Sequence, residues 1–386
     1  MRIGKRLSSL FLKFYNVKVK EVVINHNKYL GNKQNSPKIY KGTPSKFFVS
    51  PFNMVFDEID RLLLIDFEGD ELYYSLELQI FRIDDNEYPL VILYRKDNLM
   101  DIYYVYPKIL ENREELIKDL LTKGSFNQLD YIDFKFKVDN YGLDCSLSLK
   151  DKFERVIEIN IREQCIDREL NSMLAPVAAE SNKPQYFPII YLNKFGNMIK
   201  HDNIISIKIN SEEKHPTEMP VKMNGMHTYL TRYSLNPVIC NWNNSYQGEL
   251  PLIMTNDDSS TFIHNGITYS LFANNAFIEI EKISGEDNKN NKVSFEFSPA
   301  IPNLLALRNN IKQNGRFSCC VNNKKGIFAG KYLITTIGNN ISLEILPTIG
   351  WQPFPGRIWL KTYKWKSEII IQDDKTINID STWKRI

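Results

Sequence analysis

The segment LYYSLELQIF at residues 72–81 decides the fold class, because apolar and polar side chains alternate along it. Successive side chains of an extended strand point to opposite faces, so this alternation is typical of a β-strand with one buried face. Asp84-Asp85-Asn86 follows as a turn, and residues 88–95 repeat the apolar pattern. The sequence therefore predicts a β-hairpin at residues 72–95.

The same alternation makes Glu77 a candidate ligand-binding residue. In a regular strand, Glu77 and Gln79 share one face with Tyr73 and Phe81. In a barrel this face would project the Glu77 carboxylate into the interior. The alternative is that the face meets solvent, as one face of an antiparallel sheet often does.

Strand patterns recur along the chain. The clearest second hairpin joins residues 145–149 to 156–161 through Lys150-Asp151-Lys152, with isoleucine at every second position from Ile157. Asn265-Gly266 between alternating apolar residues is the strongest turn signal in the chain. We therefore expect antiparallel strands in both halves of the chain.

Helical patterns are fewer and shorter. Residues 112–123 place their apolar side chains on one face, and Gly124 follows as a C-cap. Pro302 opens a second predicted helix that runs to Ile311, and residues 56–63 have the spacing of a further short helix.

Many short strands and few helices favour antiparallel sheets that close as barrels or sandwiches. The strand signals lapse between residues 165 and 190, where Pro176 and Pro184 lie among small and polar residues. We therefore expect a mainly β protein with a few short helices and two antiparallel β-barrel or sandwich domains. The N-terminal β domain would cover residues 1–175, and the C-terminal β domain would cover residues 185–386.

A barrel of about eight strands can hold one small ligand, as lipocalins do. A lipocalin-like barrel is therefore one form that these domains could take. The comparison rests on strand number and size, so it is an analogy of shape.

Composition places the chain among ordinary globular proteins, because its 386 residues are 43% hydrophobic and 25% charged. The formal net charge of +3 provides no strong field for nucleic acid, so no nucleic-acid partner is expected. The five cysteines have no Cys-x-x-Cys spacing, and the five histidines are scattered. This pattern predicts reduced thiols and neither a metal site nor a disulfide framework.

Residues 2–15 read as a basic amphipathic helix, because Ile3, Leu7, Leu10 and Phe14 recur at helical spacing. Such a helix could contact an anionic membrane surface, or it could pack on its own domain. Its apolar run is too short for a signal peptide or a membrane span, which favours a cytoplasmic protein.

No motif identifies a reaction. The sequence lacks phosphate-loop, dinucleotide-binding, zinc-protease, serine-hydrolase-elbow and EF-hand patterns. No cofactor is therefore expected, the catalytic residues are unknown, and the sequence leaves open whether the protein is an enzyme.

His227, Tyr229 and Tyr233 form the main candidate site. Strand alternation places all three on one face of residues 227–234, so that face combines aromatic rings with hydrogen-bonding groups. Such a wall suits a pocket for an apolar ligand. The alternative is a partly exposed strand whose rings lie flat on the surface.

Trp359 and Trp365 form a second candidate, because four of the five tryptophans lie after residue 350 and these two share strand parity. If exposed, they could stack on sugars or hold an apolar ligand. If buried, they form the core of a closing sheet.

Three functions follow from these candidates. The first is binding or non-redox conversion of an apolar small molecule, such as a lipid or terpenoid, in a barrel-type cavity. The second is a carbohydrate-binding or carbohydrate-processing β protein that uses the aromatic platforms. The third is a structural or assembly protein without a pocket. The sequence leaves the oligomeric state open.

Overall fold

The computed structural model describes residues 25–31, 34–111, 124–164, 170–175, 184–201, 203–220, 222, 225–255, 260–350, 363–372 and 376–386. Strands make up 67% of the structure and helices 4%. The predicted mainly β class, with barrel-like and sandwich-like sheets and few short helices, is confirmed.

Two compact units divide the described chain. Unit 1 contains Glu58–Met173 and Leu192–Pro237, and unit 2 contains the residues up to Asp57, Leu174–Tyr191 and Val238–Ile386. The sequence prediction divided the chain once, between residues 165 and 190. The units instead draw on several segments each, and the division falls within the long strands β12 (Phe187–Ile199) and β15 (Thr228–Trp242).

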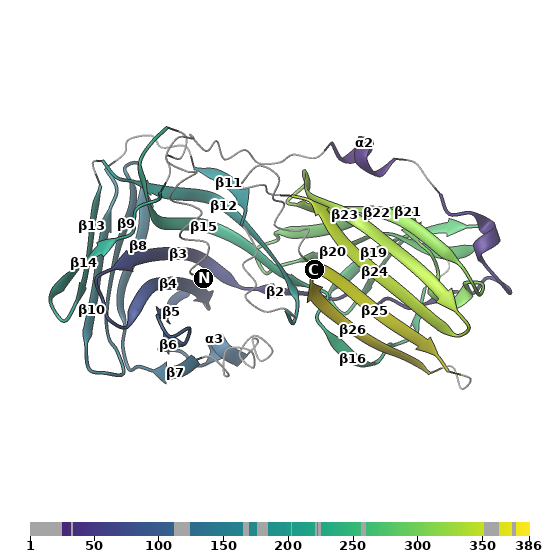
Figure 1. The fold of residues 1–386 in the computed structure, drawn as a ribbon, viewed down its shortest axis with the longest axis horizontal. Helices are drawn as coiled ribbons and strands as arrows, with labels where there is room; N and C mark the ends of the chain where they lie inside the picture. Colours follow the sequence, from purple (N-terminus) through teal and green to yellow (C-terminus); the bar gives the residue numbers. More distant parts are fainter. Residues whose placement is uncertain are drawn as a thin grey trace. The chain divides into compact units, whose positions relative to one another are not determined.

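Unit 1 is a curled sheet that forms a half-barrel (Figure 1). Its strands follow the order β7-β6-β5-β4-β3-β14-β13-β10-β9-β8, and β6 and β7 are parallel to each other. The bounds are β3 (Ile59–Glu68), β4 (Tyr73–Ile83), β5 (Asn86–Arg95), β6 (Met100–Tyr104), β7 (Gly124–Gln128), β8 (Asp133–Asp139), β9 (Gly142–Lys150), β10 (Val156–Arg162), β13 (Ile204–Ile209) and β14 (Glu212–Pro216), with helix α3 (Lys108–Glu111) after β6. Both predicted hairpins, β4–β5 and β9–β10, are confirmed.

The core of unit 1 lies on the inner face of this sheet. Strands β3, β4 and β5 and strands β8, β9, β10 and β13 contribute to one apolar cluster, whose members include Leu63, Ile65, Tyr73, Leu76, Leu78, Val91, Tyr103, Phe136, Leu147, Ile159 and Ile207. Because strand side chains alternate, each strand sends every second residue into this cluster.

A β-bulge changes the predicted faces of β4. The pairing with β5 shifts between Tyr73 and Ser75, which leaves Tyr74 as an extra residue in the strand. Tyr73 therefore enters the core with Leu76, whereas Glu77 points to the other face. The prediction that Tyr73 shares the face of Glu77 is wrong for this reason.

Residues 56–63 form strands and not the predicted helix. β2 (Met54–Asp57) pairs with β15, and β3 pairs with both β4 and β15. Apolar residues occupy both faces of β3, and this continuous apolar run mimics helical spacing.

Unit 2 contains a ten-stranded sheet in the order β16-β26-β25-β24-β23-β22-β21-β20-β19-β18. The bounds are β16 (Tyr246–Glu249), β18 (Thr261–His264), β19 (Ile267–Asn274), β20 (Phe277–Glu286), β21 (Lys292–Ile301), β22 (Lys312–Val321), β23 (Lys324–Ile337), β24 (Asn340–Ile349), β25 (Tyr363–Ile371) and β26 (Ile377–Arg385). A two-stranded sheet pairs β1 (Phe47–Phe48) with β17 (Ile253–Met254), and α2 (His26–Leu30) and the 3-10 turn η2 (Pro37–Ile39) precede it. β11 (Asn171–Leu174) pairs with β12.

Aromatic rings fill the core of unit 2. Trp242 stacks on Phe295 with ring centroids 3.9 Å apart, and Phe328 lies edge-on to Phe295 at 5.8 Å. Trp383 and Phe187 stack at 5.0 Å in the same cluster. Offset and edge-on pairs of this kind add stability beyond the burial of their area.

Several sequence predictions have other outcomes. The helix predicted at residues 302–311 is only the short 3-10 turn η3 (Leu304–Ala306). The chain then rejoins the sheet, because the Thr336 N–H donates a hydrogen bond to the Ile311 carbonyl at 3.0 Å. The predicted helices at 2–15 and 112–123 lie outside the described residues, so the membrane contact suggested for the first of them stays a prediction.

The predicted Asn265-Gly266 turn is confirmed between β18 and β19. Asn265 has φ 47° and Gly266 has φ 73°, as a two-residue hairpin turn of the primed type requires. No neighbouring atom would meet a Cβ at Gly266, so a substitution there changes backbone strain alone.

We expect Gly266→Ala to lower the free energy of unfolding by about 1 kcal/mol, because an L-residue is strained at this φ. Gly266→Asn should lower the free energy of unfolding less, because asparagine tolerates the left-handed region. A denaturant titration followed by circular dichroism measures both variants. Equal stability of Gly266→Ala and the wild type would contradict the turn geometry.

Candidate functional site

The predicted site residues of unit 1 lie on opposite faces of one sheet. Leu64 of β3 lies opposite both Glu77 of β4 and Arg232 of β15, whereas Leu63 lies opposite Tyr233. Because adjacent strand residues point to opposite faces, Glu77 and Tyr233 cannot line one pocket. The structure therefore provides two separate environments.

Glu77 is half-buried, and two neighbouring side chains donate hydrogen bonds to it. Its carboxylate accepts hydrogen bonds from the Tyr94 hydroxyl at 2.8 Å and from the Gln79 amide at 2.6 Å. Burial, and then the nearby Glu77 carboxylate, raise the pKa of Tyr94 well above its usual value. The arrangement fixes β4 to β5 through side chains.

Tyr233 is buried on the inner face and reaches a second carboxylate. Its hydroxyl donates to Glu163 Oε2 at 2.7 Å, and the backbone N–H of Leu143 donates to the same oxygen at 2.8 Å. Glu163 is itself 1% exposed. A buried carboxylate needs such donors, because water no longer solvates its charge.

Two glycines leave room for this pair. A Cβ at Gly142 would lie 2.4 Å from Glu163 Oε2, and a Cβ at Gly196 would lie 2.8 Å from Cζ of the Tyr233 ring. The backbone of β9 and that of β12 therefore approach the pair more closely than any other residue type allows.

Sequence reasoning missed Glu163, although a signal was present. Glu163 continues the parity of Ile157, Ile159 and Ile161, which all face the core from β10. A carboxylate at the next inward position is a buried-acid signal in a strand that otherwise alternates regularly.

The other predicted residues of this face differ in exposure. His227 precedes the first residue of β15 and its side chain is exposed, whereas Tyr229 is half-buried against the core. The structure thus brings Tyr229 and Tyr233 to the same inner face and leaves His227 outside the strand.

Asp101 is the centre of a polar cluster at one end of unit 1. It accepts hydrogen bonds from Tyr73 at 2.9 Å, from Ser125 at 2.8 Å and from the Lys152 ammonium at 2.7 Å. The Asp101 side chain is 1% exposed and that of Lys152 is 27% exposed. The cluster joins β4, β6 and β7 to the turn between β9 and β10.

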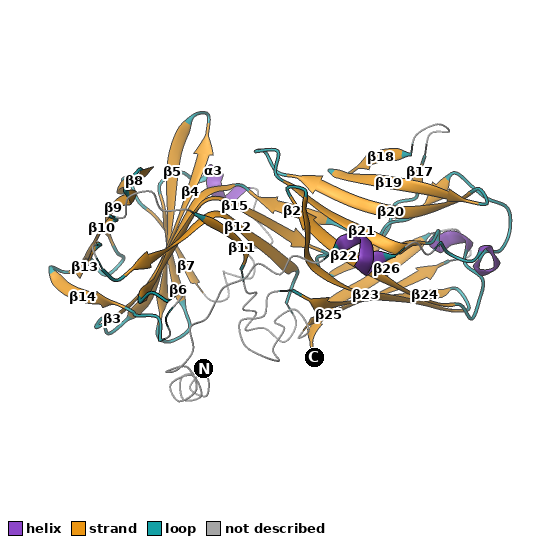
Figure 2. Cartoon of the chain, turned by 90° about the horizontal axis from the view of Figure 1, so that it is seen from above, coloured by secondary structure: helices purple, strands orange, loops and turns teal. Residues whose placement is uncertain are grey.

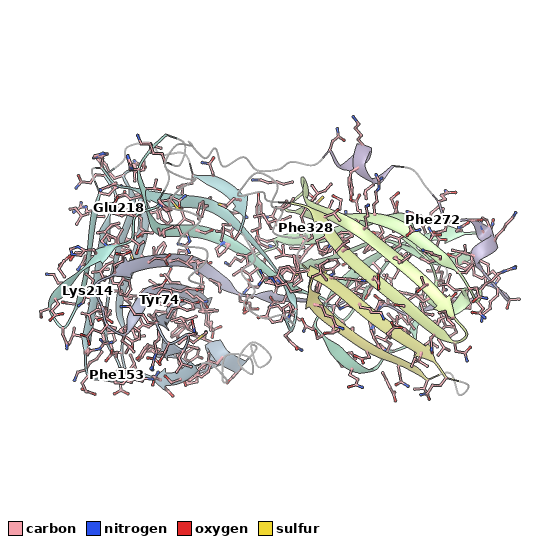
Figure 3. The ribbon with its side chains drawn as sticks, viewed as in Figure 1. Tyr74, Phe153, Lys214, Glu218, Phe272 and Phe328 are labelled. Atoms are coloured by element: carbon pink, nitrogen blue, oxygen red, sulfur yellow. The ribbon has the colours of Figure 1, made fainter. Side chains whose placement is uncertain are left out.

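Arg155 forms the adjoining part of the same cluster. Its guanidinium lies 2.9 Å from Asp151 and 3.3 Å from Asp70, and it covers the Tyr73 ring at 4.8 Å. Phe153, in the same turn, is exposed (Figure 3). The buried carboxylates of Asp70, Asp101 and Asp151 therefore each have a basic partner, so the charges are compensated internally.

The remaining candidates are the two tryptophans, Trp359 and Trp365. Trp365 is fully buried in the aromatic core, 6.4 Å from the Phe52 ring, so it does not form a surface platform. Trp359 lies outside the described residues.

Unit 2 contains its own buried carboxylate, Glu279. It accepts hydrogen bonds from the amides of Asn35 and Asn274, both at 2.9 Å, and from the Tyr40 hydroxyl. These donors are neutral, and they attach the residues around η2 to β19 and β20. The cluster is a structural link within unit 2.

The described ranges carry neither a candidate metal-ligand cluster nor a candidate membrane-spanning helix. These ranges contain no group of three or more His, Cys, Asp or Glu side chains placed to hold a metal ion. They also contain no helix with the length and apolar character needed to cross a bilayer. Cys145, Cys240, Cys319 and Cys320 form no disulfide among the described residues; the first three are buried, Cys320 is half-buried, and Cys165 is not described.

We expect Tyr233→Phe to lower the free energy of unfolding by about 1.5–3 kcal/mol, because it removes a hydrogen bond to a buried carboxylate. Tyr141→Phe, at an exposed tyrosine of the same unit, is the matched control and should stay within about 0.5 kcal/mol of the wild type. Denaturant titration measures both. Equal effects of the two substitutions would contradict the role of the Glu163 contact.

Alkaline pH should destabilise the fold, because burial raises the pKa of Tyr73 and Tyr94. The unfolded chain releases these protons near pH 10.0, whereas the folded chain retains them. Above that pH the unfolded state binds fewer protons, so stability falls as pH rises. A tyrosinate absorbance titration should show these tyrosines ionising only as the fold is lost. Reversible ionisation of every tyrosine near pH 10.0 in a folded protein is the opposing result.

Comparison of the chain with protein-family models, curated proteins and solved structures finds no match, so its function must be inferred from its own residues.

Proposed function

We propose that this chain is a structural or assembly protein that acts by joining its β surfaces to other protein chains. The observation that carries this proposal is the occupied interior of the unit 1 half-barrel. Large side chains fill it, and they include the fully buried Tyr73, Tyr103 and Leu76. Close-packed protein interiors contain few voids larger than a water molecule.

Binding of an apolar small molecule requires an enclosed space with a few polar groups that remain available to the ligand. The buried carboxylate of the inner face is already engaged, since Glu163 accepts hydrogen bonds from the Tyr233 hydroxyl and from the Leu143 N–H. A ligand would have to displace a hydrogen bond to a buried charge, which costs more than an ordinary neutral one. The filled interior therefore favours the assembly function over the ligand-binding function.

Carbohydrate binding requires an exposed aromatic platform. Trp242, Trp365 and Trp383 are each 0% exposed and stabilise the core of unit 2. This burial also favours the assembly function.

The surface of unit 2 offers apolar side chains to a partner. Phe47 lies opposite Met254 in the β1–β17 pair, and both are exposed, as is Leu252, which directly precedes β17. A cross-strand pair of apolar side chains stabilises a sheet through contact between the two side chains. Exposed apolar groups of this kind mark contact surfaces when they adjoin one another.

A hydrophobic fluorescent probe tests the proposal. If the interior is filled, the folded protein should show no saturable one-to-one probe binding, because no enclosed apolar space is available. His227→Ala and Tyr229→Phe should then leave the probe signal unchanged. Saturable stoichiometric binding that either substitution weakens would contradict the assembly function and restore the small-molecule one.

A further inference from the structure

Strand β18 ends the ten-stranded sheet of unit 2. Within the described part of that unit it pairs with β19 alone, and it lies at the margin of the sheet (Figure 2). The four residues of β18, Thr261–His264, include no Asp, Glu, Lys or Arg. This strand is therefore an uncharged sheet edge.

The pairing with β19 shows which main-chain groups face this edge. The backbone N–H of Leu271 donates to the carbonyl of Ser260 at 2.7 Å, and His264 and Ile267 flank the two-residue turn. Antiparallel hydrogen bonds involve alternate residues, so Ser260, Phe262 and His264 bond to β19. The N–H and C=O groups of Thr261 and Ile263 therefore point away from the sheet.

The side chains do not obstruct this edge. Ile263 is 69% exposed, and Thr261 is exposed as well. Phe262 turns to the opposite face, where its ring lies 6.4 Å from Phe48 in the apolar core. An approaching strand would therefore meet the exposed Ile263 side chain on one face and the Phe262 ring, already packed against the core, on the other.

We propose that two copies of this chain join through β18, strand to strand and antiparallel, around a two-fold axis at Phe262. This inference rests on the assembly function proposed above. In this register Thr261 lies opposite Ile263 of the second copy, and Ile263 lies opposite Thr261. These two pairs form four main-chain hydrogen bonds, and Phe262 lies beside Phe262 of the second copy.

The edge strand β8 of unit 1 is protected against such pairing. The same two-fold pairing about Phe136 would place Lys135 opposite Lys137 and Asp133 opposite Asp139, so like charges would meet. The Arg61 guanidinium also donates to the Phe136 carbonyl at 2.6 Å and lies 5.2 Å from its ring.

Proteins usually block sheet edges with charges or with covering groups, because open edges recruit other strands. β8 carries both devices, whereas β18 carries no charged residue and leaves Thr261 and Ile263 exposed. A second copy is the occupant that these observations favour, since the edge is complementary to itself and brings no like charges together.

Sedimentation velocity over a concentration series tests this dimer. The wild type should show a monomer–dimer equilibrium. Ile263→Pro removes an N–H that faces the partner and none that bonds to β19, so it eliminates two of the four hydrogen bonds. We expect the dissociation constant to rise at least about tenfold.

Ile263→Lys provides a second variant, because it places two ammonium groups on diagonal positions of the same face. Its matched control is Ile337→Lys, which changes an isoleucine of the same unit that is 73% exposed. We expect Ile263→Lys to weaken the dimer and Ile337→Lys to leave it unchanged. Thermal unfolding by circular dichroism should be similar for the two lysine variants, which separates loss of contact from loss of fold.

A wild type that remains monomeric up to about 100 µM would overturn the dimer, because its dissociation constant would then be too high for a specific complex. A dimer that resists both Ile263 substitutions would overturn it as well. Neither result alters the absence of saturable probe binding, which tests the assembly function separately.

Discussion

An open sheet leaves a row of main-chain donors and acceptors on its outermost strand, and the proposed dimer depends on the difference between two such strands, β8 and β18. In β8, charged side chains and the Arg61 guanidinium occupy the edge. In β18, Thr261 and Ile263 are exposed, and their main-chain N–H and C=O groups point away from the sheet. Because an unpaired edge favours addition of another strand, this difference supports the proposed association through β18.

The buried polar groups have a complementary role, because they hold strands in position within each unit. Tyr233 donates to Glu163 in unit 1, and Asn35 and Asn274 donate to Glu279 in unit 2. Each carboxylate is nearly or fully buried, so losing one donor would leave charge without solvation. These groups therefore stabilise the fold.

Local patterns in the sequence were sufficient for the β class, the β4–β5 and β9–β10 hairpins and the Asn265-Gly266 turn, since neighbouring residues determine each of these. The bulge at Tyr74 could not be predicted, because it depends on pairing with β5. For the same reason, no local pattern shows that Glu77 and Tyr233 lie on opposite faces, or that β18 is an edge. The buried Glu163 was predictable from its parity with Ile161.

Hydrogen exchange at single amides tests the association account most directly. If β18 joins a second copy, protection of the Ile263 amide should increase with protein concentration. Protection of the Phe262 amide, which already faces β19, should change much less. An Ile263 amide that exchanges rapidly and equally at all concentrations would contradict the account.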